Sequence, residues 1–103
     1  MTEPSEAALI DGVIQRLRAG ERFRAGGVDD ANGQVGRPTT GEWHTLRADG
    51  GEFVFVLETM SRALGATVDE TSRTETRMSE ATLRAALAEM RGPMRGLVGL
   101  PYR

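Results

Sequence analysis

The chain of 103 residues contains no cysteine and one histidine. The lack of cysteine excludes disulfides, thiolate nucleophiles and Cys-ligated zinc or iron–sulfur sites. A single histidine, His44, excludes multi-histidine metal sites, and nothing in the sequence indicates a catalytic triad around it. We therefore expect a protein without cofactor or metal that is not an enzyme.

Long apolar runs are also missing. No stretch approaches the roughly 18 apolar residues of a membrane helix. The first residues, Met-Thr-Glu-Pro-Ser, lack the basic segment and apolar run of a signal peptide. The sequence therefore predicts a cytoplasmic protein that does not enter the membrane.

Lysine is absent, so all 13 basic residues are arginines, and 15 acidic residues give a net charge of −2. This balance argues against a protein that coats nucleic acid. Arginine without lysine, combined with 13 glycines, is typical of a GC-rich coding genome, which suggests a bacterial or phage origin.

The length fits one domain, residues 1–103, and a domain this short has a thin core. Two helices are predicted from their caps and apolar spacing. Ser5 begins a helix over about 5–19, and Ser79 begins another that ends at Gly92-Pro93. Their apolar faces consist of Leu9, Ile10, Val13, Ile14 and Leu17 in the first, and Leu83, Ala86, Leu87 and Met90 in the second.

A β-hairpin is predicted around Asp49-Gly50-Gly51, with strands at 43–48 and 52–57. Because side chains alternate across a strand, the residues divide into two faces. The predicted core face holds His44, Leu46, Phe53, Phe55 and Leu57. The other face holds Trp43, Thr45, Arg47, Glu52, Val54 and Val56.

The remaining segments give weaker patterns. We expect a short strand at 21–24, a glycine-rich loop over 26–41 and a short helix at 59–64. Residues 66–77 form either an exposed edge strand or a solvated connection, and we favour the strand. The tail 94–103 is apolar without a period. The expected fold is a small single α+β domain with an N-terminal helix, a central antiparallel hairpin or sheet, and a C-terminal helix followed by this tail.

The leading functional hypothesis is a non-enzymatic protein–protein interaction module, such as a small accessory, inhibitory or assembly subunit. Exposed apolar side chains on one sheet face and on the tail suggest docking, in cis or in trans, onto a protein partner or a second copy in a homodimer. The expected contact residues are Trp43, Val54, Val56, Leu97, Val98, Leu100 and Tyr102.

Two alternatives remain open. Arg24, Arg37 and Arg47 near the glycine-rich loop suggest a small protein that sequesters an anionic metabolite or nucleotide. The C-terminal arginines suggest a nucleic-acid contact, which is less favoured because Tyr102 is the only aromatic residue near them. Gly36 and Gly41 have the spacing of a phosphate-binding loop, but Glu42 stands where that motif needs lysine.

Overall fold

The computed structural model describes residues 5–29, 39–63, 65, 68–89 and 93–100. Its elements are helix α1 (Glu6–Arg18), strands β1 (Phe23–Asp29), β2 (Thr39–Asp49), β3 (Glu52–Arg62) and β4 (Glu70–Met78), and helices α2 (Glu80–Ala88) and α3 (Pro93–Leu97). The strands form one antiparallel sheet in the order β1-β2-β3-β4. The predicted α+β fold is confirmed.

Both predicted helix starts are confirmed by their caps. The Ser5 hydroxyl accepts a hydrogen bond from the Ala8 N–H at 3.2 Å, and the Ser79 hydroxyl accepts one from the Thr82 N–H at 3.2 Å. Each bond satisfies a backbone donor that has no partner within its own helix. The two serines therefore set where α1 and α2 begin.

The predicted hairpin is present and is longer than expected. Gly50 adopts a φ of 63°, which suits a tight turn, and Asp49 pairs with Glu52 directly beside it. The expected short helix at 59–64 is wrong, because β3 continues to Arg62. Thr59 is paired on both sides, with Glu42 of β2 and Ser72 of β4, and this pairing outweighs a single pair of apolar residues at helical spacing.

The predicted loop over 26–41 is too long. Strand β1 extends to Asp29 and β2 begins at Thr39, so, of the predicted loop, residues 30–38 lie outside the described residues and the rest belongs to the strands. At Gly26 the strand pairing requires glycine, because φ is 138° and a Cβ would lie 2.0 Å from the Glu42 carbonyl oxygen. This backbone approach is closed to any other residue, so the glycine has a structural role in the strand.

The uncertain segment 66–77 contains the edge strand β4, as favoured, over Glu70–Met78. The apolar tail contains a short helix, α3, which the sequence pattern does not predict. Gly99 ends it with a φ of 78°, and the Leu100 N–H donates to the Arg95 carbonyl at 2.8 Å. The described part of the tail therefore turns back onto its own domain.

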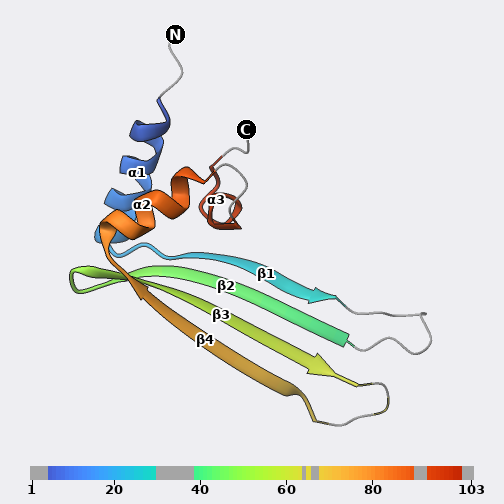
Figure 1. Ribbon diagram of the computed structural model, residues 1–103. Coiled ribbons are helices and arrows are strands. Elements are labelled where there is room, and N and C mark those ends of the chain that lie inside the picture. Colours follow the sequence, from blue (N-terminus) through green and yellow to red (C-terminus); the bar gives the residue numbers. More distant parts are fainter. Residues whose placement is uncertain (1–4, 30–38, 64, 66–67, 90–92, 101–103) are drawn as a thin grey trace.

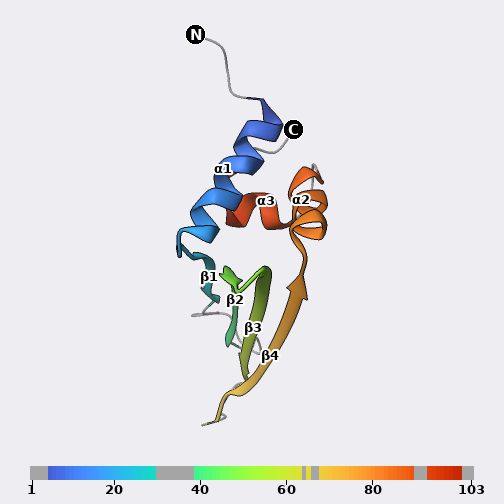
Figure 2. The same cartoon turned by 90° about the vertical axis from the view of Figure 1, so that its left-hand side faces the viewer.

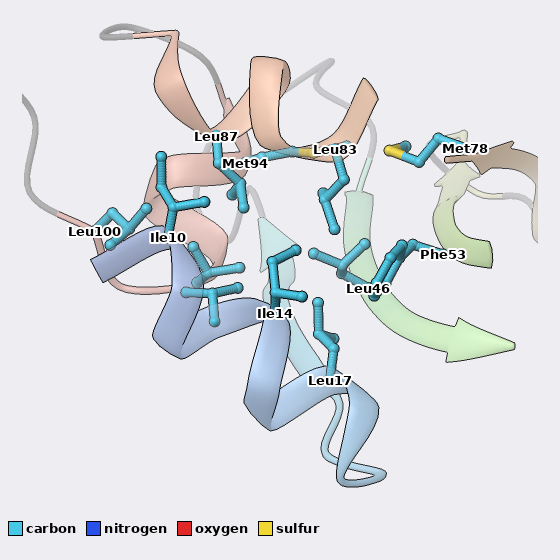
Figure 3. Close-up of a cluster of buried hydrophobic side chains, with 12 residues drawn as sticks. Ile10, Ile14, Leu17, Leu46, Phe53, Met78, Leu83, Leu87, Met94 and Leu100 are labelled. Atoms are coloured by element: carbon cyan, nitrogen blue, oxygen red, sulfur yellow. The ribbon is translucent and has the colours of Figure 1, made fainter. Parts of the chain in front are cut away.

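The core lies between the three helices and one end of the sheet (Figure 3). Helix α1 packs against β2, α2 against β3, and α3 against β1. Two ion pairs also join α1 to α2: Arg18 with Glu80 at 2.6 Å, and Arg84 with Asp11 at 2.6 Å. The buried apolar side chains are Ile10, Val13, Ile14, Leu17, Leu46, Phe53, Met78, Leu83, Leu87, Met94, Val98 and Leu100.

The helices gather at one end of the sheet, and the strands run on beyond them (Figures 1 and 2). Strands β2 and β3 have 11 residues each, so each spans about 36 Å, whereas the 13 residues of α1 span about 20 Å. The radius of gyration, 16.8 Å, exceeds the roughly 13 Å of a compact domain of this length. Much of the sheet therefore lacks a covering layer among the described elements.

Candidate interaction surface

The sheet has two chemically different faces. The first face carries Leu46 and Phe53 and packs on the helices, as predicted from the alternation. The second face carries Trp43 and Arg47 of β2, and none of the described helices lies on it.

At the helical end of the second face, apolar side chains lie beneath charged ones. Val54 is fully buried and lies in register between Arg47 and Arg77 on the same face. Val56 is buried between Thr45 and Glu75. Both valines were predicted as contact residues, and the structure places them below the solvent-exposed layer.

Ion pairs connect the charged side chains above the valines. Arg47 lies 3.6 Å from Glu75 and 3.9 Å from Asp49, and Arg77 hydrogen-bonds the Asp49 carboxylate. The hydrogen bond from Arg77, and then its charge, lower the pKa of Asp49 below its ordinary value. This end of the face is a self-neutralised polar surface.

Away from the helices, the second face becomes apolar around Trp43. A Cβ at Gly41 would lie 2.5 Å from the indole ring, which shows that the six-membered part of the ring lies against the bare glycine backbone. Gly41 pairs with Val28 on one side and with Met60 on the other. Val28 is 52% exposed, while Trp43 and Met60 are partly exposed. We call Val28, Trp43 and Met60 the Trp43 patch.

A shallow hollow of about 510 Å³ adjoins this patch. Trp43 and Met60 supply its apolar part, whereas Glu58 and Arg73 supply charges of opposite sign. Thr71 adds a hydroxyl group, whereas Thr59 and Ser72 border the hollow although their side chains belong to the first face of the sheet. The hollow therefore has an aromatic side chain at its edge and polar groups around it.

The remaining predicted contact residues belong to the tail. Val98 and Leu100 are buried in the core of their own chain, and Leu97 packs against it. Tyr102 lies outside the described residues. The structure therefore places Trp43 apart from the tail, on a different part of the molecule, and it adds Val28 and Met60, which no apolar run in the sequence marks.

The arginines proposed for an anionic ligand are only partly brought together. Arg24 pairs with Thr45 and is exposed on the second face, beside the row that contains Arg47. Arg47 already faces the carboxylates of Glu75 and Asp49. Arg37 lies outside the described residues. Two arginines, one of them neutralised, do not by themselves form an anion site.

Two of the C-terminal arginines are used within the fold. Arg95 is fully buried and bonds the Glu6 carboxylate and, at 2.8 Å, the Leu87 carbonyl oxygen. Arg84 pairs with Asp11 and with Glu80. Arg91 and Arg103 lie outside the described residues. The sequence gives no sign that Arg95 is a core residue, because its neighbours alone do not predict that α3 forms.

His44 has structural partners on the first face. Its Nε2 lies 2.7 Å from the Glu42 carboxylate, and its ring tilts against Phe55 with the centroids 5.6 Å apart. Across the residues that the structure describes, no group of three or more His, Asp or Glu side chains is arranged to hold a metal. No helix in the same part of the chain is long and apolar enough to span a membrane.

Comparison with protein families, with curated proteins and with solved structures finds no match for this chain.

Proposed function

We propose that this protein is a non-enzymatic protein-interaction module that binds a partner protein through the Trp43 patch. The observation that supports it is the position of the chain's only tryptophan, against Gly41 and between two apolar neighbours, on a sheet face that no described helix covers. A partner that covers this face would bury apolar surface that now contacts water.

The composition of the surface favours a protein over a small molecule. Tryptophan and methionine are enriched at protein interfaces, and tryptophan is frequent among the residues that dominate binding energy. The adjoining hollow is open and shallow, so a small ligand would remain largely solvated in it, unlike in the enclosed pockets that bind such ligands. Glu58 and Arg73 beside the patch would fix the orientation of a partner.

The test compares two valines that are both exposed. Val28→Ser removes an apolar side chain from the patch, and Val68→Ser removes one that is 73% exposed elsewhere. Each tagged protein, together with Trp43→Ala, is used to capture binding proteins from an extract of the source cells. We expect the wild type and Val68→Ser to capture the same partner in equal amounts. Val28→Ser and Trp43→Ala should capture at least tenfold less of it.

The fluorescence of Trp43 gives a direct second measurement, because the chain has one tryptophan. Addition of the purified partner should shift the emission to shorter wavelength and protect the indole from acrylamide quenching. Unchanged capture by Trp43→Ala and Val28→Ser, in proteins whose circular dichroism matches the wild type, refutes the proposal.

A further inference from the structure

We propose that β4 pairs with β4 of a second copy of this chain, so that two four-stranded sheets join into one antiparallel sheet of eight strands. Strand β4 lies at the edge of the sheet, and its residues from Glu70 to Arg77 are all exposed. An edge strand presents unpaired backbone N–H and C=O groups, which another strand can satisfy. This inference does not rest on the proposed function, because it depends on the backbone edge of β4 and not on Trp43, although Arg73 of β4 also borders the hollow beside the Trp43 patch.

The charge pattern of β4 is self-complementary. The strand reads Glu-Thr-Ser-Arg-Thr-Glu-Thr-Arg-Met, and its middle residue is Thr74. If a two-fold axis passes through Thr74, Arg73 of each copy lies opposite Glu75 of the other, and Ser72 lies opposite Thr76. Opposite charges and hydroxyl pairs directly across two strands stabilise a sheet, whereas like charges destabilise it.

This register is selected over its neighbours by both charge and length. Pairing centred on Thr74 keeps side chains on matching faces and joins all nine residues of each strand. A shift that centres the pair on Arg73 or Glu75 sets like charges opposite each other at the axis. A shift that centres it on Ser72 or Thr76 leaves four residues of each strand unpaired.

The arrangement of the helices agrees with this pairing. The axis is perpendicular to the sheet, so the first faces of both copies lie on the same side, with the strands running in opposite directions. Helix α2 follows β4 directly after Met78, and Met78 lies opposite Glu70 of the second copy. In each copy the helices lie at one end of the sheet and leave the other end uncovered (Figures 1 and 2). In the dimer, the helices of one copy would therefore stand beside the uncovered end of the other copy's sheet.

The other edge of the sheet is less suited to such pairing. Strand β1 contains Gly26 with a φ of 138°, which departs from the extended backbone of a regular strand. Pairing of β1 with β4 of another copy would not form a closed dimer, because each copy would keep one free edge and the pairing would continue into a filament. The β4 edge alone gives a closed pair with matched charges.

The experiment uses single cysteines, because the natural chain has none. At the axis, the two Thr74 Cα atoms would lie about 4.5–5.5 Å apart, which falls within the range of a disulfide. The two Thr76 positions would lie about 14 Å apart, which does not. Thr74→Cys and Thr76→Cys therefore replace the same residue type on the same exposed strand face, and they differ only in their distance from the axis.

We expect the wild type to have the mass of a dimer by light scattering at 100 µM. Under mild oxidation, Thr74→Cys should form a covalent dimer at least tenfold faster than Thr76→Cys. A mixture of Ser72→Cys with Thr76→Cys should form the mixed dimer. A monomeric wild type overturns the inference, and so does equal cross-linking of Thr74→Cys and Thr76→Cys.

Charge reversal tests the same contact without a cysteine. Arg73→Glu places two like-charge pairs across the axis and should weaken dimerisation at least tenfold. Combining Arg73→Glu with Glu75→Arg restores opposite charges and should recover the dimer relative to Arg73→Glu alone. Trp43→Ala should leave the dimer intact, so a failure of the dimer and a failure of the proposed partner site are separate results. Failure of the double variant to recover the dimer contradicts the register.

Discussion

Replacing Arg95 by methionine tests whether a buried arginine holds the C-terminal segment in place. Arg95 belongs to α3, has no exposed surface, and bonds to Glu6 of α1 and to Leu87 of α2. It therefore joins all three helices at one side chain. Arg95→Met keeps most of the apolar stem and removes the charged group that makes these contacts.

The expected cost follows from the two partners. The Leu87 carbonyl loses a buried donor, which costs about 1–3 kcal/mol. Breaking a fully buried ion pair costs about 3–5 kcal/mol, but the Glu6 side chain is 23% exposed, so water will hydrate its carboxylate in part. We therefore expect a loss of about 2–4 kcal/mol in the free energy of unfolding, or a fall in Tm of roughly 10–25 °C.

Arg84→Met is the matched control. Arg84 also has two acidic partners, Asp11 and Glu80, but its side chain is 38% exposed and its ion pairs are solvated. Thermal unfolding followed by circular dichroism should give a much smaller fall in Tm for Arg84→Met than for Arg95→Met. Equal falls in the two variants would show that burial of Arg95 does not determine its contribution.

Two further predictions concern the sheet. Gly26→Ala should destabilise the fold by about 1–3 kcal/mol because Gly26 has a positive φ and lies close to the Glu42 carbonyl. Gly27→Ala is the control, because a Cβ at Gly27 would meet nothing within 4 Å, and it should be tolerated. Similar urea unfolding midpoints for the two variants would contradict this role for Gly26. Asp49 has a lowered pKa in the folded state because of Arg77, so its contribution to stability is complete above its ordinary pKa of about 4 and is lost as the pH falls through the lowered value. Unfolding midpoints measured between pH 5 and pH 2 should therefore decline more steeply in the wild type than in Arg77→Met, and parallel declines would count against the pair.

Local chemistry in the sequence was sufficient to predict the helix starts and the central hairpin. Ser5 and Ser79 bond to backbone groups three residues away, and Gly50 needs only its own conformational freedom, so neighbouring residues decide these features. The alternation along β2 and β3 was sufficient to assign the core face, because side chains on a strand must alternate. Trp43 could be identified as a surface candidate for the same reason.

Tertiary structure decided the features that depend on distant partners. Residues 59–61 extend a strand because β2 and β4 lie on both sides of them, and 26–29 form a strand because β2 supplies hydrogen bonds. Arg95 is a core residue only because α1 and α2 bring an acceptor to it from each side. The Trp43 patch likewise needs Val28, Gly41 and Met60 from three strands in register. Sequence determines what each residue can do locally, and long-range pairing determines which residues meet.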